Sequence, residues 1–253
     1  MNKVETAKKI TFTSRLARDL RKNKAVYIML IPAIVYYLIF CYGPMYGAII
    51  AFKDYSPKLG ILGSHWAGVK HFKSFLTSPY FFRILKNTLN ISLQTLIFGF
   101  PAPIILALLI NEIGSKRFAK LSQTVTYLPH FISLVVVCGM IKSFTMNNGF
   151  INDILVTLTG GHWQPVSMLN EPKYFVPIYV ITNIWQEVGW GSIIYLSALA
   201  GIDQELYEAA TIDGAGRWRQ TLNVTLPGIL PMVVIMLILR IGGLLNVGYE
   251  KII

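Results

Sequence analysis

The chain alternates between long apolar runs and shorter polar segments, and the apolar runs have the length of membrane spans. Crossing the hydrocarbon core of a bilayer takes about 20 predominantly apolar residues in a helix. A soluble core would instead show short, periodic apolar patches. The pattern therefore predicts an all-α, polytopic membrane helical bundle with five visible spans, at about 26–50, 88–110, 121–143, 175–199 and 228–248.

These spans define the domain organisation. Residues 1–24 form a basic N-terminal segment, and residues 25–253 form one transmembrane domain. The first apolar run is long and lacks a small-residue cleavage site, so we expect an uncleaved span rather than a signal peptide. In the second span, Pro101 and Pro103 predict a kink, which a membrane helix tolerates when its neighbours satisfy the freed carbonyl groups.

Composition agrees with a membrane protein. Of the 253 residues, 54% are hydrophobic and 14% are charged, against roughly 25% charged residues in a soluble domain. Much of the net charge of +11 precedes the first span, which favours an anionic membrane surface over nucleic acid as a partner. The two cysteines and four histidines lack disulfide or metal-ligand spacing, so we expect no metal site.

The positions of Lys and Arg in the loops predict the orientation. With a cytoplasmic N-terminus, thirteen basic residues fall on the inner side and nine on the outer side. We therefore expect a multi-pass protein of the cell (plasma) membrane with its N-terminus in the cytoplasm. The 53–87 loop is both basic and aromatic, and two interpretations stay open: it lies along the membrane interface, or it is a simple exposed loop.

In this orientation the polar 200–227 loop is cytoplasmic, and its local signals predict two short helices. Asp203 can cap the first helix, and Asp213-Gly214 supplies the turn after QELYEAAT. Gly216 leads into RWRQTLNV, and Leu226-Pro227 is predicted to end the unit before the last span. The many alanines leave the backbone bare, which favours docking in a groove of another protein.

This loop resembles the EAA loop of binding-protein-dependent ABC importer permeases. The resemblance is carried by Glu208-Ala209-Ala210, Gly214, Val224 and Leu226-Pro227. Segments 68–89 and 207–231 are similar to carbohydrate-importer permeases of the maltose-permease type, in the branch for oligosaccharides and polysaccharides. Since such permeases have a six-span core, the resemblance implies that the chain is truncated before a sixth span.

The resemblance implies a transport subunit rather than an enzyme. It would form the pathway for an oligosaccharide, with an ABC ATPase dimer in the cytoplasm, a second permease in a heterodimer, an extracellular solute-binding protein and membrane lipid as partners. No GxxxxGK[ST] phosphate loop is present, so ATP and Mg²⁺ are expected on the ATPase, and no cofactor on this chain. The implied ATPase-coupling residues are Glu208, Ala209, Ala210, Asp213, Gly214, Ala215, Leu226 and Pro227.

The candidate substrate pathway follows from polar residues inside the spans. Asn183, Gln186, Glu187 and Trp190 share one helix face, at positions i, i+3, i+4 and i+7. A polar face with an indole suits a sugar, but the same face can also hold helices together. A charge at the centre of a span costs about 2.5–3.5 kcal/mol on insertion scales, so Glu187 and Arg240 are predicted to pair across the bundle.

Other interpretations stay open at this point. An ion-coupled secondary carrier would use Glu187 and Arg240 as its relay, but it leaves the EAA spacing unexplained. A membrane-embedded enzyme would need more convergent ionisable groups. An ABC permease for a non-sugar solute shares the EAA loop. Gln94, Gln123 and Pro129-His130 interrupt apolar runs and are interpreted as kinks or packing contacts.

Overall fold

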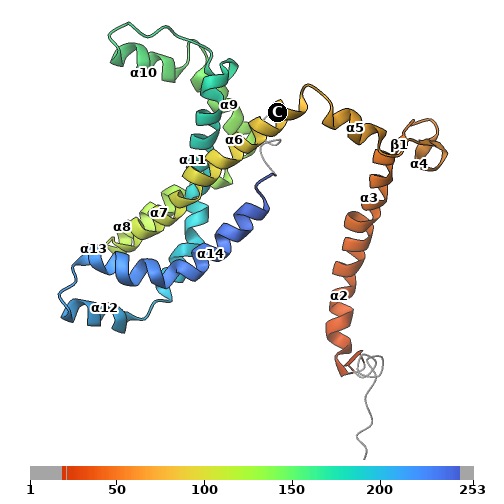
Figure 1. Cartoon of the computed structure of the whole chain (residues 1–253). Coiled ribbons are helices and arrows are strands. Elements are labelled where there is room, and N and C mark those ends of the chain that lie inside the picture. The colour runs from red at the N-terminus through yellow and green to blue at the C-terminus, as the bar shows by residue number, and fades with distance from the viewer. Residues whose placement is uncertain (1–18, 21, 246–253) are drawn as a thin grey trace, which may run out of the picture. The chain divides into compact units, whose positions relative to one another are not determined.

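The structure is a computed structural model that describes residues 19–20 and 22–245, in two units that are treated separately (Figure 1). Unit 1 extends to Phe81 and unit 2 begins at Phe82. Most of the predicted basic segment 1–24 lies outside the described residues. The helical membrane class is confirmed, because four helical stretches are long and apolar enough to cross a membrane: Lys24–Phe52, Phe81–Asn111, Leu134–Leu158 and Arg217–Gly242.

Unit 1 begins with a helix of membrane length at the predicted first span. Its successive parts are α2 (Lys24–Tyr36), a π-helical turn (Tyr37–Tyr42), α3 (Gly43–Met45) and a 3-10 helix (Tyr46–Phe52). None of these parts has a buried residue within the chain. A helix that is apolar all round needs lipid or another protein around it.

Residues 53–76 of the predicted 53–87 loop form a folded module in unit 1. Strand β1 (Lys53–Asp54) pairs antiparallel with β2 (His65–Trp66), and α4 (Gly60–Gly63) lies between them in the chain. Helix α5 (Lys70–Leu76) follows. The ring of Phe52, at the end of the preceding helix, stacks on Trp66 with centroids 5.8 Å apart. Aromatic packing thus holds the hairpin against the end of the first span.

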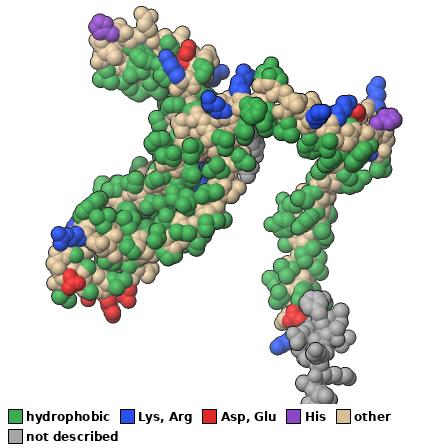
Figure 2. All heavy atoms as spheres, viewed as in Figure 1, with side chains coloured by type: hydrophobic (Ala, Val, Ile, Leu, Met, Phe, Trp, Pro, Cys, Tyr) green, Lys and Arg blue, Asp and Glu red, His purple; other side chains and the backbone are tan. Residues whose placement is uncertain are grey.

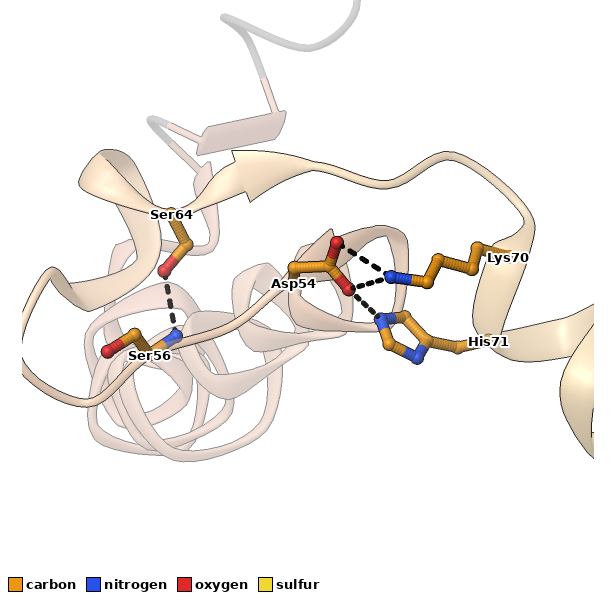
Figure 3. A network of polar contacts seen from close by, with 5 residues as sticks. All are labelled: Asp54, Ser56, Ser64, Lys70 and His71. Atoms are coloured by element: carbon orange, nitrogen blue, oxygen red, sulfur yellow. Dashed lines mark hydrogen bonds and ion pairs between the residues drawn. The ribbon is translucent and has the colours of Figure 1, made fainter.

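Polar contacts close the same module (Figure 3). Lys70 Nζ donates to both carboxylate oxygens of Asp54 at 3.0 Å, and His71 Nε2 lies 3.1 Å from Asp54 Oδ1. The backbone N–H of Ser56 donates to Ser64 Oγ at 3.1 Å. The Lys70 ammonium lowers the pKa of the Asp54 carboxyl group below its ordinary value of 3.8. This pair therefore joins the strand to α5.

We expect Asp54→Asn to loosen this module. Because the folded-state pKa of Asp54 is lowered, its contribution to stability is fully present above pH 3.8 and is lost as the pH falls through the folded-state value. Amide hydrogen exchange in 53–76 should therefore rise at neutral pH in the variant, by a modest factor because the ion pair is solvent-exposed. Lys58→Gln, which removes an exposed charge outside the Asp54–Lys70 pair, is the control. Equal exchange in the two variants would contradict the prediction.

Unit 2 packs its helices around the long helix α11 (Pro172–Ala200). Its main neighbour is α7 (Pro101–Asn111), and it also contacts α8 (Lys116–Tyr127) and α14 (Leu226–Gly242). The buried core that α7, α11 and α14 share consists of Ala107, Tyr195, Leu199 and Ile229. Helix α11 is not among the four most apolar stretches, because polar side chains interrupt it, yet it lies at the centre of the unit.

The second predicted span is divided, as its prolines predict. Helix α6 (Phe81–Gly99) ends one residue before Phe100, and α7 begins at Pro101. Pro101 and Pro103 stand in the first turn of α7, where a helix has no partner for the backbone N–H in any case. The prolines therefore coincide with a one-residue interruption between α6 and α7, at which the backbone of Phe100 stays in the right-handed helical region.

The third predicted span, 121–143, is wrong as a continuous helix. Helix α8 ends early, a 3-10 turn (Leu128–Phe131) follows, and α9 (Leu134–Thr145) starts anew. Pro129 cannot donate to a helical ladder, and Ser133 accepts a hydrogen bond from the first turn of α9 at 3.4 Å. These two residues stop one helix and start the next inside an apolar run.

The chain between α9 and α11 forms a short helix, α10 (Phe150–Leu158). A 3-10 turn, Met168–Asn170, precedes α11. Asn152 is fully buried, and its Nδ2 donates to the carbonyl groups of Met146 at 2.7 Å and Val166 at 2.9 Å. The buried Asn152 amide therefore links the chain before α10 to the chain after it.

Figure 1 places α10 at one end of unit 2, and α12 (Gln204–Ile212) and α13 (Arg217–Gln220) at the opposite end. Figure 2 shows hydrophobic side chains along the flank between these ends, with acidic and basic side chains gathered at the α12–α13 end. A hydrophobic flank between two polar ends is the surface expected of a membrane-spanning bundle.

The prediction that Leu226-Pro227 ends the cytoplasmic unit is wrong. A π-helical turn (Thr221–Thr225) joins α13 to α14 without a break, so one helical stretch runs from Arg217 to Gly242. Pro227 stands near the start of α14, and the wider π-helical turn before it absorbs the irregular hydrogen bonding. The second part of this loop is thus continuous with the helix of the last predicted span.

Candidate functional site

Unit 2 contains a cavity of about 1030 Å³. Ligand pockets for small molecules are commonly about 300–1,000 Å³, so this volume suits a large ligand. Helices α6, α7, α11 and α14 line it, together with the break between α8 and α9. The structure places all five predicted pathway residues in its wall: Asn183, Gln186, Glu187, Trp190 and Arg240.

Two buried polar atoms in the cavity wall have no hydrogen-bond partner among the described residues. They are Gln186 Oε1 and Thr95 Oγ1. Gln186 is 6% exposed, and its Nε2 donates to the carbonyl oxygen of Ile132 at 3.4 Å, in the break of the third span. Buried polar atoms are nearly always hydrogen-bonded, so these acceptors are suited to a ligand hydroxyl or to water.

The acidic group of the cavity pairs with a histidine rather than with an arginine. His130 Nδ1 lies 3.0 Å from Glu187 Oε2. The predicted pair of Glu187 with Arg240 is therefore wrong in the part of the chain that the structure describes, where the Arg240 side chain makes neither an ion pair nor a hydrogen bond. His130 lies in the 3-10 turn that interrupts the third span, and this turn contacts α11.

The cavity has an aromatic wall. The His130 ring stacks on the Trp190 indole with centroids 4.5 Å apart and planes 1° apart. Phe131 meets the same indole edge-on at 5.8 Å. Trp190 is 46% exposed within the chain, so part of the indole is free to contact a ligand. The sequence analysis did not predict that His130 belongs to the cavity wall. The one sequence signal for it was the interruption of an apolar run by Pro129-His130.

The second candidate site is the 200–227 loop. The Asp203 carboxylate accepts a hydrogen bond from the backbone of α12 at 3.1 Å, as its capping position predicts. The turn after α12 uses Gly214 with φ +75°, where the N–H of Ala215 donates to the carbonyl of Ala210 at 2.9 Å. This is the Schellman arrangement, which favours glycine because the left-handed backbone region is strained for other residues.

Side-chain hydrogen bonds that were not predicted from the sequence stabilise this loop. Gln220 Nε2 donates to Thr211 Oγ1 at 2.9 Å and to the carbonyl of Ala215 at 3.0 Å. The hydroxyl groups of Tyr207 and Thr225 lie 3.0 Å apart. The Gln220–Thr211 and Tyr207–Thr225 contacts join α12 to the helical residues after the turn, and the Gln220–Ala215 contact joins α13 to the turn itself. The loop is therefore a braced hairpin.

The outer surface of the braced hairpin is open. Glu208 and Gly214 are exposed, and so are the large apolar side chains of Ile212 (87%) and Trp218 (73%). An exposed carboxylate beside exposed apolar groups is typical of a protein–protein contact. Of the predicted coupling residues, Leu226 and Pro227 lie in α14 rather than in the hairpin.

Comparison with known proteins gives consistent matches. Residues 99–247 match the family described as "Binding-protein-dependent transport system inner membrane component". Two relatives are from Bacillus subtilis (strain 168). Protein LplB is 47% identical over 92% of this chain and 73% of its own length. The polygalacturonan/rhamnogalacturonan transport system permease protein YteP is 45% identical over 94% of this chain and 74% of its own length.

A solved structure matches over most of the chain. It is the crystal structure of a bacterial alginate ABC transporter in complex with an alginate pentasaccharide-bound periplasmic protein. One of its chains is 43% identical, with a TM-score of 0.83, and the match covers 94% of this chain and 78% of that chain. The family match includes both the 200–227 loop and the helices that line most of the cavity.

Proposed function

The chain belongs to the binding-protein-dependent transport system inner membrane component family, and we propose that it forms the translocation pathway for an oligosaccharide in an ATP-driven ABC importer. The observation that carries this function is the cavity in unit 2, whose wall combines a polar helix face with a stacked indole. The hydroxyl groups of a sugar need such hydrogen-bonding groups, and its apolar ring face can stack on an aromatic ring.

The relatives support a saccharide rather than another solute. YteP is named for polygalacturonan and rhamnogalacturonan, and the solved transporter for alginate. The cavity of this chain has the volume and the free hydrogen-bond acceptors for such a ligand. Alternating access of this cavity to the two sides of the membrane would carry the oligosaccharide across.

The partners in this proposal follow from the two ends of unit 2. The exposed hairpin of α12 and α13 would dock on a cytoplasmic ABC ATPase dimer, which would bind and hydrolyse ATP with Mg²⁺. A second, different permease would complete the pathway beside the exposed apolar helices. An extracellular solute-binding protein would deliver the oligosaccharide, and the solved alginate transporter is in complex with such a periplasmic protein.

The proposed orientation puts the N-terminus in the cytoplasm. The start of α8 and the α12–α13 hairpin are drawn at the same end of unit 2 (Figure 1). That end carries Lys116, Arg117, Lys120, Arg217 and Arg219. Basic residues collect on the cytoplasmic side of membrane proteins, which supports this assignment.

We expect the double variant Asn183→Ala, Gln186→Ala to lose ATP-dependent oligosaccharide uptake while the transporter still assembles. Both side chains line the cavity, and losing two ligand hydrogen bonds should lower uptake by roughly tenfold or more. The measurement is uptake by proteoliposomes that contain the complete importer. Thr182→Ala, on the same helix but outside the cavity wall, is the control.

The outcomes of this experiment separate the candidate functions. Loss of assembly in the double variant would assign these residues to helix packing instead of substrate binding. Uptake that follows an ion gradient without ATP would support a secondary carrier and contradict the importer. ATP-dependent uptake of an amino acid or peptide, but of no oligosaccharide, would keep the importer and overturn the substrate class.

A further inference from the structure

We propose that Arg240 binds a carboxylate of the transported saccharide, and that the importer is therefore selective for acidic, uronate-containing oligosaccharides. This inference rests on the oligosaccharide function proposed above and adds the charge of the substrate and the residue that recognises it. Three features of unit 2 carry it: the position of Arg240, the pairing of Glu187, and the aromatic wall.

Arg240 is the one lysine or arginine among the described residues that line the cavity. It lies in the last turn of α14, within an otherwise apolar helix. A guanidinium group in a membrane span is costly, and such groups face a polar cavity and find a counter-charge. Within the described chain its side chain has neither an ion-pair partner nor a hydrogen-bond partner, so the counter-charge is open to a ligand.

The acidic group of the same wall, the Glu187 carboxylate, already has a partner within the chain. Glu187 Oε2 lies 3.0 Å from the imidazole of His130, which is itself fixed by stacking on Trp190. A free carboxylate there would both pair with Arg240 and repel an acidic substrate. With Glu187 held by His130, the cavity presents a guanidinium group without a carboxylate bound to it.

A uronate unit matches this arrangement of groups. A guanidinium group binds a carboxylate through two parallel N–H···O bonds, with a geometry that an ammonium group cannot reproduce. Trp190 offers an indole to the apolar face of a sugar ring, and Asn183 and Gln186 offer polar groups to its hydroxyls. A neutral sugar would use the indole and the amides but would leave Arg240 without a counter-charge.

The test measures equilibrium binding to the purified complex of the permeases and the ATPase, without the binding protein, so that selectivity belongs to the membrane cavity. The probes are labelled oligogalacturonate and oligomannuronate, each compared with its neutral methyl ester. We expect the complex to bind at least one acid about tenfold more tightly than its ester. Arg240→Gln should abolish this preference, and Arg240→Lys should retain part of it. Lys142→Gln, which removes a positive charge outside the cavity wall, should change nothing.

The outcomes distinguish this inference from the function on which it rests. Binding of the esters as tightly as the acids would overturn the charge selectivity and leave oligosaccharide import in place. An equal loss of acid and ester binding in Arg240→Gln would mean that the arginine supports the fold, which would also overturn the proposal. A complex that neither binds nor imports any oligosaccharide would overturn the proposed function and this inference together.

Discussion

Replacing Gly189 with alanine is expected to displace α11 from α8 and to destabilise unit 2. Gly189 is buried where α11 packs directly against the backbone of α8. A Cβ atom at this position would overlap the carbonyl group of Thr126 and lie 2.9 Å from the backbone N of Tyr127. Both obstacles are backbone atoms, which cannot rotate away as a side chain can. Overpacking commonly costs about 1–3 kcal/mol, and we expect the upper part of that range or failure to fold.

Gly139 provides a matched control for this prediction. It also lies inside a helix, α9, but a Cβ added there meets no atom of the chain within 4 Å. Since alanine is the better helix former, Gly139→Ala should be neutral or slightly stabilising in the isolated subunit. The measurement is the yield of monodisperse protein in detergent and its thermal unfolding midpoint. Equal midpoints for the two variants would contradict the close approach of α11 to α8.

The close approach at Gly189 also explains why the cavity could be predicted only in part. Asn183, Gln186, Glu187 and Trp190 share one face because of helix periodicity, which the sequence alone reveals. All four do line the cavity. What they face is set by contacts between distant parts of the chain, such as the pair of Glu187 with His130, 57 residues away. A local sequence pattern carries no information about a contact between residues so far apart in the chain.

Helix ends near prolines were also predicted incorrectly. In the third predicted span, Pro129 and Ser133 stop one helix and start another, although the surrounding residues are apolar throughout. Hydropathy measures the free energy of transferring residues into lipid. It does not report where the backbone hydrogen bonds of one helix end and those of the next helix begin. The opposite error occurred at Pro227, where the sequence predicted an end and the helix continues through a π-helical turn. Proline near a helix start is compatible with either outcome.

The 200–227 loop was the most predictable part of the molecule, because its signals are local. Asp203 caps α12 and Gly214 takes the left-handed conformation, as the sequence predicts. The contacts that brace the hairpin, from Gln220 and Tyr207, join residues on either side of the turn and were not predicted. A braced hairpin joined to α14 without a break can transmit a force from a partner to the last span, which is what coupling requires.

We expect Glu208→Lys and Gly214→Val each to prevent docking of the proposed ATPase on the permease while the spans still insert. Glu208 is exposed on α12, so reversing its charge should leave the hairpin folded and remove a contact with the partner. Gly214 has φ +75°, and a β-branched residue is strongly disfavoured there, so the valine variant should distort the turn instead. The measurement is co-purification of the permease with a tagged ATPase, followed by ATP-dependent uptake. Both should fall to near background.

The two variants act by different physical routes, so their joint effect is informative. Glu112→Lys makes the same charge change in the loop after α7 and should leave co-purification intact. If Glu112→Lys releases the ATPase as completely as Glu208→Lys does, general electrostatics rather than the hairpin controls docking. If Gly214→Val alone has an effect, the shape of the turn matters and the Glu208 carboxylate does not. The expected pattern is that both hairpin variants lose co-purification and uptake, that Glu112→Lys keeps both, and that the spans insert in all three variants. This pattern would identify the hairpin as the element that connects ATP hydrolysis to the cavity.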